Sequence, residues 1–438
     1  MLGTADNETL TRVGPGTSMG EYLRRFWSPA LLEEELPEPD CAPVRVRLFG
    51  ESLVAFRDTS GRVGLVKSMC PHRGTDLFFG RNEEDGIRCP YHGWKFDVAG
   101  TCVEMPTENA ESNFKEKVHL TAYETAEAGG IIWAYLGPKD KIPPLPHFPY
   151  FDLPANQRIS TKYLRECNWL QSLEGGVDSV HTNFLHITLS RYKNTPGYQE
   201  RLAARGTEDL DLRYRSGDTA PRFFAHRTDG GFLVASRRDA DEEQYYWRFN
   251  QYLVPFYSVP PRGAGGGHAF VPLDDYQSWS YNISARTDRA YTKEEMQTIK
   301  SGNIPTGQDD AGGLQNAERI PGTYITVRNK SNDFLIDREM QKHTNFTGIV
   351  GTGNQDSMAQ ASMPAIMDRT QEHLGITDLG IIAIRRLLLK EVRDLEDGVE
   401  PPEASDAEAY HIRGIHFVEG REVTLADAVE ARRETMYR

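Results

Sequence analysis

Two short pairs of cysteine and histidine constrain the fold of this chain more than any other feature of its sequence. Cys70 and His72 are separated by one residue, Cys89 and His92 by two, and sixteen residues lie between His72 and Cys89. Each pair offers one thiolate and one imidazole. The spacing predicts two loops that bring the four side chains to one point, within a mostly β segment of short strands.

This set of ligands is that of a Rieske-type [2Fe-2S] cluster, in which two cysteines hold one iron and two histidines hold the other. The competing interpretation is a zinc site, which uses the same side chains. Cys2His2 zinc fingers place both cysteines before both histidines, whereas the order here is Cys, His, Cys, His. The order favours a cluster bound by Cys70, His72, Cys89 and His92.

A second group of metal-binding residue types lies in the stretch NWLQSLEGGVDSVHTNFLH, residues 168–186. Two neutral imidazoles beside a carboxylate are the ligands of a facial non-haem iron site, and His181 and His186 are five residues apart. On one straight α-helix this spacing places the side chains roughly 140° apart. We therefore expect the helix to end or bulge between them. The alternative is an ordinary helix with one histidine on each side.

The two motifs together resemble a known family. A Rieske pattern followed by N-W-x4-E-x3-D-x2-H-x4-H is similar to the α subunit of Rieske non-haem iron aromatic ring-hydroxylating oxygenases. The stretches VGPGTSMGEYLRRFW and LEGGVDSVHTNFLH resemble the phthalate dioxygenase and phenoxybenzoate dioxygenase branch. The resemblance covers nearly the whole chain, and it is specific for the class of chemistry but not for the substrate.

The resemblance implies an α+β fold with two domains. An all-β Rieske [2Fe-2S] domain is followed by a helix-grip catalytic domain, in which an antiparallel sheet and helices surround a mononuclear iron. The proline-rich segment KIPPLPHFPYFDLP predicts a stiff connector. We place the boundary there, so that residues 1–150 form the N-terminal helix and Rieske domain and residues 151–438 form the catalytic domain.

Local patterns agree with this division. Ser18 and Glu21 form a capping-box pair that predicts a helix ended by Pro29. Alternation over residues 44–58 predicts a β-hairpin, and alternating aromatic and β-branched residues over 221–287 predict an antiparallel sheet.

The resemblance also implies where the missing carboxylate of the mononuclear iron lies. The closest match to the family is Asn354-Gln355-Asp356, whose aspartate completes the triad from a separate helix. Asp368 is the rival, although the family uses the corresponding aspartate as a structural residue. We expect His181, His186 and Asp356 to bind Fe(II).

Asp178 lies three residues before His181 and has a different implied role. In the family this aspartate hydrogen-bonds the metal-bound histidine of its own chain and a cluster histidine of the next chain in a closed trimer. The alternative is a residue that only orients His181. We group Asn168 with Asp178 as a candidate catalytic residue, and a structural role near the site is the alternative for Asn168 and for Glu174.

Composition excludes several classes of function. A net charge of −14 over 438 residues argues against nucleic acid as a partner. The sequence has no run of eighteen apolar residues and no signal-peptide pattern, so we expect no membrane span and a cytoplasmic protein. Five cysteines, an odd number, do not suggest a disulfide framework.

The implied activity is that of a terminal oxygenase. An NAD(P)H-dependent reductase with flavin and iron–sulfur groups would deliver electrons to a homotrimer, or to a hexamer built from trimers. The main hypothesis is cis-dihydroxylation of an aromatic carboxylate, phthalate-like or isophthalate-like, with O2. The alternative is an O-demethylating monooxygenase of a methoxylated aromatic acid. A Rieske electron carrier or a zinc-binding protein is the remote alternative.

An aromatic carboxylate requires buried arginines, because a guanidinium binds a carboxylate with two parallel hydrogen bonds. Arg248 alternates with Tyr246 and Asn250 along its predicted strand and is the substrate-binding candidate. The alternative is that each arginine of the predicted sheet lies on the surface. The sheet tract contains Arg222, Arg227, Arg237, Arg238 and Arg248.

Overall fold

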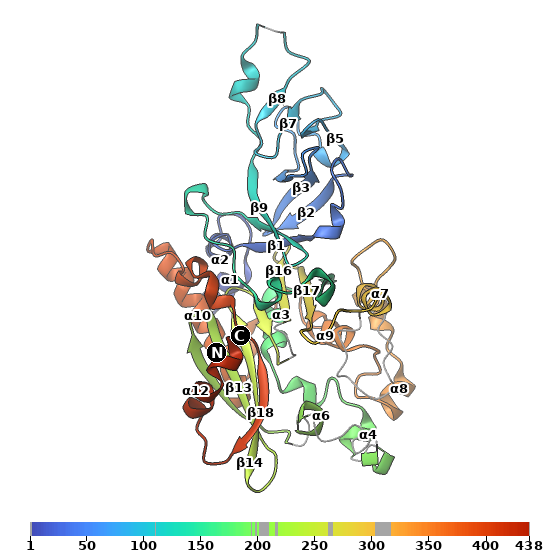
Figure 1. Ribbon diagram of the computed structural model, residues 1–438, viewed down its shortest axis with the longest axis vertical. Helices are drawn as coiled ribbons and strands as arrows, with labels where there is room; N and C mark the ends of the chain where they lie inside the picture. The colour runs from blue at the N-terminus through green and yellow to red at the C-terminus, as the bar shows by residue number, and fades with distance from the viewer. Residues whose placement is uncertain are drawn as a thin grey trace. The chain divides into compact units, whose positions relative to one another are not determined.

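The computed structural model describes residues 2–109, 111–193, 195–197, 199–200, 210–214, 218–261, 266–302 and 317–437 (Figure 1). The chain divides into two compact units. The N-terminal unit comprises Arg12–Leu145 and Val271–Asp275, and the C-terminal unit comprises Met1–Thr11, Pro146–Phe270 and Tyr276–Arg438. The first residues of the chain thus group with the C-terminal unit, not with the N-terminal one as predicted.

In its described residues, the N-terminal unit contains two sheets, one short α-helix and several 3-10 turns. The larger sheet has six strands in the order β1-β10-β9-β4-β3-β2, and the smaller has four in the order β5-β6-β7-β8. The predicted hairpin is β2 paired with β3, joined through Phe49 and Gly50. The elements are α2 (Ser18–Leu23), β1 (Ser28–Leu32), β2 (Val44–Leu48), β3 (Glu51–Arg57), β4 (Val63–Lys67), β5 (Arg81–Glu83), β6 (Gly86–Arg88), β7 (Lys95–Phe96), β8 (Cys102–Glu104), β9 (Ala122–Ala128) and β10 (Ile131–Tyr135).

The C-terminal unit contains an eight-stranded sheet in the order β11-β17-β16-β15-β14-β13-β12, with β18 paired to β14. Residues from the end of the chain therefore lie beside the central strand β14. The strands are β11 (Arg158–Arg165), β12 (Arg222–Thr228), β13 (Gly231–Asp239), β14 (Gln244–Leu253), β15 (Tyr257–Val259), β16 (His268–Pro272), β17 (Ser278–Ala285) and β18 (Ile415–Gly420). An all-β unit followed by an antiparallel sheet with helices confirms the predicted α+β class.

Helix α3 packs on this sheet with its apolar residues buried, among them Trp169, Leu170 and Leu173. Within the described part of the chain, no helix combines the length and the apolar character needed to cross a membrane. The helices of the C-terminal unit are α1 (Thr4–Thr11), α3 (Trp169–Val177), α4 (Leu189–Tyr192), α6 (Leu210–Tyr214), α7 (Lys293–Ser301), α8 (Arg338–His343), α9 (Thr352–Ala361), α10 (Leu379–Glu396), α11 (Pro402–Ser405) and α12 (Leu425–Met436).

Two glycines allow α3 to approach its neighbours closely. A Cβ on Gly175 would lie 2.2 Å from Nε2 of Gln360 in α9, and a Cβ on Gly176 would lie 2.3 Å from the ring of Phe270 in β16. Both distances are well below van der Waals contact. The glycines of the motif therefore permit α3 to pack against α9 and the sheet at its C-terminal end.

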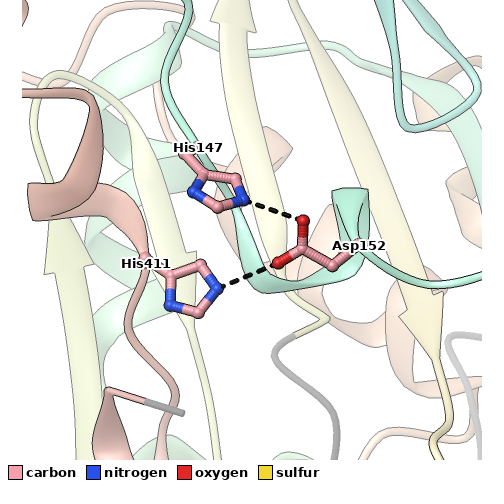
Figure 2. A group of neighbouring side chains, drawn as sticks. All are labelled: His147, Asp152 and His411. Carbon is pink, nitrogen blue, oxygen red and sulfur yellow. Dashed lines mark hydrogen bonds and ion pairs between the residues drawn. The ribbon is translucent and has the colours of Figure 1, made fainter.

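The proline-rich connector is attached to a segment near the end of the chain. The backbone N–H of His147 donates to the carbonyl of Ala407 (3.0 Å), and the ring of Phe148 lies 5.5 Å from that of Tyr410. Figure 2 shows the polar side of this contact, where His147 and His411 both face Asp152.

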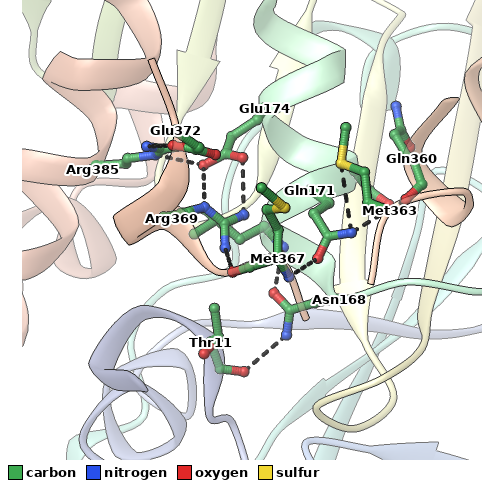
Figure 3. Close-up of polar contacts among 12 residues, drawn as sticks. Thr11, Asn168, Gln171, Glu174, Gln360, Met363, Met367, Arg369, Glu372 and Arg385 are labelled. Atoms are coloured by element: carbon green, nitrogen blue, oxygen red, sulfur yellow. Dashed lines mark hydrogen bonds and ion pairs between the residues drawn. The ribbon is translucent and has the colours of Figure 1, made fainter. Parts of the chain in front are cut away.

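A buried group of charges connects α3 to the C-terminal helices (Figure 3). Both carboxylate oxygens of Glu174 accept from the fully buried Arg369, at 3.1 and 2.9 Å, and Oε1 also accepts from Arg385 at 2.6 Å. Arg385 in turn donates to Glu372. Burial opposes ionisation of Glu174, but the two guanidiniums outweigh it and lower the pKa of that carboxyl. The group is neutral overall and fixes α3 against α10.

Replacing Glu174 with glutamine should destabilise the C-terminal unit by about 3 kcal/mol, because two buried guanidiniums then share the single carboxylate of Glu372. The measurement is thermal unfolding followed by tryptophan fluorescence. Asp394→Asn is the matched control, since it removes an exposed ion pair with Lys390 on α10 and should change little. Equal losses in the two variants would contradict the role given to the buried group.

Candidate metal centres

The four predicted cluster ligands lie on two loops of the N-terminal unit with the same local structure. In the first loop the N–H of Gly74 donates to the carbonyl of Cys70 (2.9 Å), and in the second the N–H of Gly93 donates to the carbonyl of Cys89 (3.0 Å). Gly74 has φ +76° and Gly93 has φ +74°, a left-handed conformation that glycine adopts without strain. The repeated turn places each cysteine at the start of its loop.

The side chains of these loops converge as a cluster site requires. Both cysteines are 2% exposed, and the rings of His72 and His92 lie 4.4 Å apart at the half-buried edge. Burial raises the pKa of the Cys70 thiol to about 11, so cationic iron is needed to stabilise its thiolate form. The ring of Trp94 stacks on the ring of His72, with their centroids 4.3 Å apart, and so covers one face of this ligand. The donor set therefore fits a [2Fe-2S] cluster.

The predicted ligands of the mononuclear iron also lie together. Nε2 of His186 is 3.2 Å from Nε2 of His181 and 3.1 Å from Oδ1 of Asp356, and His181 Nε2 is 3.6 Å from the same oxygen. Asp356 lies on α9, a helix separate from α3. Asp368, the rival candidate, instead caps a short 3-10 helix at Arg369–Gln371 and is not part of this group.

The local structure of the motif differs in one respect from the prediction that the helix ends or bulges between His181 and His186. Helix α3 ends at Val177, and Asp178 is already extended, with ψ 129°. The N–H of Val180 donates to Oδ1 of Asp178 (2.7 Å), and His181 begins a short 3-10 helix, His181–Asn183. The helix therefore ends before both histidines rather than between them, which lets both imidazoles point to one centre.

A hydrogen bond to the outer nitrogen orients His186, and an ionised carboxylate lies near the outer nitrogen of His181. Gln355 donates its amide Nε2–H to the carbonyl of Ile349 (2.9 Å), so its Oε1 faces Nδ1 of His186 at 2.7 Å and accepts. Nδ1 of His181 lies 3.5 Å from Oδ2 of Asp178. His186 then presents an Nε2 lone pair to His181 and Asp356. Two imidazoles and one carboxylate directed at one point are a donor set that fits Fe(II).

The charges around the centre favour the ionised forms of Asp356 and Asp178. Burial opposes ionisation of Asp356, but His186 and His181 outweigh it and hold the pKa of Asp356 well below its usual range, with a further contribution from Arg165. Burial likewise opposes ionisation of Asp178, and His181 outweighs it, so the pKa of Asp178 is lowered. Both groups are therefore anionic at neutral pH.

A cavity of the C-terminal unit adjoins the centre. Among the described residues that line it are Arg248 and Asn250 of β14, His268 and Phe270 of β16, and Arg165. Arg248 thus lies where the sequence predicted a substrate ligand, and it is only 6% exposed. The other four arginines of the tract do not line the cavity: Arg222 and Arg227 are exposed, Arg237 stacks on Tyr245, and Arg238 is buried against Ser236 and Ser179.

Sequence reasoning missed Arg165 and His268. Arg165 donates to Ser357 on α9 (2.8 Å) and to the hydroxyl of Tyr163 (2.7 Å). His268 Nδ1 lies 2.9 Å from Oδ1 of Asn282. In the sequence, Arg165 is marked only as a charged residue inside a strand just before the motif. His268 is marked only as a histidine at the start of an apolar strand.

Asn168 lies at the opposite end of α3 from Asp178. Its Oδ1 accepts from the N–H of Leu170 (3.1 Å), and its Nδ2–H donates to the carbonyl of Thr11 (2.9 Å; Figure 3). Asn168 is not among the described residues that line the cavity. These contacts give it a structural role as the N-cap of α3 and do not support the predicted catalytic role.

Replacing Gln355 with leucine should weaken binding of Fe(II) about 10- to 100-fold, because His186 loses the acceptor that fixes its tautomer. The measurement is iron content after equilibration with a chelator of known affinity, and the absorbance of the [2Fe-2S] cluster should stay unchanged. Gln371→Leu, at an exposed position, is the matched control. Equal iron affinity in both variants would show that Gln355 does not orient His186.

Comparison with known proteins agrees with both centres. A model of the Rieske [2Fe-2S] domain matches residues 26–124, and a model described as LigXa C-terminal domain like matches residues 134–414, which is more than half of the chain. Among solved structures, dicamba monooxygenase bound to dicamba has a TM-score of 0.57 at 16% identity and covers 86% of this chain and 99% of its own. The likeness to dicamba monooxygenase supports the fold of this chain.

Relatives of higher identity span nearly the whole chain. The 3-chlorobenzoate-3,4-dioxygenase oxygenase subunit of Comamonas testosteroni is 37% identical over 100% of both chains. The phthalate 4,5-dioxygenase oxygenase subunit of Pseudomonas putida is 39% identical over 91% of this chain and 88% of its own. The 5,5'-dehydrodivanillate O-demethylase oxygenase subunit of Sphingobium sp. is 32% identical over 92% and 83%. This chain belongs to the Rieske non-haem iron aromatic ring-hydroxylating oxygenases, as an oxygenase subunit with a [2Fe-2S] cluster and a mononuclear iron.

Proposed function

We propose that the chain cis-dihydroxylates an aromatic carboxylate, of phthalate or isophthalate type, with O2 and electrons from a reductase. The observation that carries this proposal is a buried arginine, Arg248, in the same cavity as the three iron ligands. Two relatives, at 37% and 39% identity, are named for aromatic carboxylates. When bound, the cluster supplies single electrons and the mononuclear iron activates dioxygen.

The protein contributes position and charge. His181, His186 and Asp356 would hold the iron, and a set of three protein ligands on one face would leave an open side for O2. On β14, Arg248 is paired in register with Ser236 of β13 and His416 of β18, so strands on both sides fix its backbone. A guanidinium held in this way can bind a carboxylate and set which ring carbons lie over the open side.

O-demethylation of a methoxylated aromatic acid is the second candidate. The relative that is 32% identical is named as an O-demethylase, and its identity is lower than that of the two dioxygenases. The same ligand set serves both reactions, because the substrate group closest to the open side decides which bond is oxidised. Arg248 would bind the acid in either case.

The experiment that distinguishes these candidates is mass spectrometry of products from iron-loaded protein with a surrogate reductase. The panel contains phthalate, isophthalate, terephthalate, phenoxybenzoate and methoxylated benzoates. We expect a product that has gained two oxygens and two hydrogens. Release of formaldehyde from a methoxylated acid would instead establish the O-demethylase, and turnover with NADH in the absence of a reductase would contradict the proposed need for one.

Replacing Arg248 with glutamine should raise KM for the accepted acid about 10- to 100-fold, the loss expected for a charge-assisted hydrogen bond. Turnover of the matching carboxamide, which carries no charge, should change much less. Arg237→Gln, on the neighbouring strand and outside the cavity lining, is the control. Equal losses for acid and carboxamide would show that Arg248 does not bind the carboxylate.

We further propose a homotrimer, or a hexamer built from trimers, in which Asp178 connects His181 to a cluster histidine of the next subunit. Two features support it: the Asp178 side chain is 26% exposed while it faces His181, and the cluster edge carries the exposed side chains of Met69, Phe79 and Tyr91. The reductase would be a separate NAD(P)H-dependent protein with flavin and iron–sulfur groups.

Asp178→Asn should keep both iron centres and lower turnover by at least about 10-fold. The reason is that an amide replaces the anionic acceptor shared by His181 and the cluster histidine of the next subunit. Iron content and cluster absorbance should match those of the parent protein. The measurement is the single-turnover rate of oxidation of the reduced cluster with substrate and O2. An unchanged rate would rule out the bridging role of Asp178.

A further inference from the structure

A second group of two histidines and one carboxylate lies outside the iron cavity. Oδ1 of Asp152 is 2.9 Å from Nε2 of His147, and Oδ2 of Asp152 is 3.2 Å from Nε2 of His411 (Figure 2). Nδ1 of His147 is 2.9 Å from Oε1 of Glu408. His147 and His411 are partly buried, whereas Asp152 is 59% exposed.

The arrangement requires a positive charge, supplied by a second proton on His147 or by a metal ion. A neutral imidazole carries one proton, so a neutral His147 that donates from Nδ1 to Glu408 has no proton left on Nε2 for Asp152. Nε2 of His147 then directs a lone pair at a carboxylate oxygen, which is repulsive unless a positive charge lies between them. With neutral imidazoles the four side chains carry a charge of −2 from Asp152 and Glu408. A divalent ion would neutralise this charge.

The group contains the same residue types as the mononuclear iron centre, although each histidine here faces a different oxygen of the carboxylate. Among the described residues, these two sets of three are the groups whose ligand atoms all lie within 4.8 Å of one another. Zinc bonds of 2.0–2.2 Å to nitrogen and oxygen place tetrahedral ligand atoms about 3.3 Å apart. The observed separations of 2.9 and 3.2 Å run to different oxygens of Asp152, so an ion would be bound by both oxygens or after a rotation of the carboxylate.

The group also contains the second interaction typical of metal-binding histidines. Such a histidine donates its outer N–H to a carboxylate or carbonyl, which directs the other nitrogen to the metal. Glu408 does this for His147. The backbone is arranged before any ion binds, because the N–H of His147 donates to the carbonyl of Ala407 and Phe148 packs against Tyr410.

We propose that His147, His411 and Asp152 bind a Zn²⁺ ion, and that this ion attaches the C-terminal segment to the connector. Two imidazoles and one carboxylate suit Zn²⁺, whereas Mg²⁺ and Ca²⁺ prefer oxygen ligands. The segment bound in this way leads directly into β18, the strand that pairs with Arg248 on β14. The ion has a structural role, and the exposed side of Asp152 leaves its remaining position to water.

The test uses the full chain with its cluster, in an Asp356→Asn background that disables the mononuclear iron site. The protein is incubated with Zn²⁺, desalted, and analysed for metal by mass spectrometry. We expect one Zn²⁺ per chain, lost when His411→Gln is added and retained when His343→Gln, at an exposed histidine of α8, is added instead. Equal zinc in all three proteins, or none in the background protein, would overturn the proposal.

Thermal unfolding gives a second readout that separates a metal from protons. Zn²⁺ should raise Tm by about 2 °C or more in the Asp356→Asn protein, because it binds only the folded state. The His411→Gln addition should remove that rise without abolishing folding. A Tm that responds to pH between 6 and 8 but not to Zn²⁺ would show that doubly protonated histidines, not a metal, hold the group together.

Discussion

The close packing of α3 against α9 is the contact on which the catalytic centre depends. The two histidines follow the end of α3, and Asp356 lies on α9, so the three ligands converge only if these helices hold a fixed separation. Gly175 makes this possible, because a Cβ there would collide with Gln360. The buried pair of Glu174 with Arg369 then fixes α3 from its other side. Packing and charge together fix α3 relative to α9 and α10.

The cavity balances opposite charges at short range. Asp356 and Asp178 remain anionic because imidazoles face them, and they supply the negative charge that an iron cation needs. Arg165 and Arg248 line the same cavity and are almost fully buried. Arg165 already donates to Ser357 and Tyr163, which fixes it beside the centre. Arg248 lies on strand β14 of the sheet and lines the same cavity.

Sequence patterns predicted what depends on local spacing. The two cysteine–histidine pairs, the hairpin at residues 44–58 and the sheet tract all have short-range signals, and the structure brings the named metal ligands together. The cap of α2 was misplaced by one residue, because Thr17 rather than Ser18 accepts from Gly20. Arg165, His268 and the grouping of α1 with the C-terminal unit could not be predicted, because each depends on contacts between segments distant in sequence.

Two histidines and one aspartate come together at two places among the described residues of the C-terminal unit. The two places differ in how far the aspartate is buried. Asp356 is 14% exposed, adjoins a cavity and lies near buried arginines, so an ion there would face substrate in a largely dry site. Asp152 is 59% exposed, and an ion bound to it would face water. Burial strengthens charge interactions at the first centre, whereas solvent screens those at the second. The first group therefore lies beside a cavity that can admit a substrate, and the second lies at the surface between two segments of the chain.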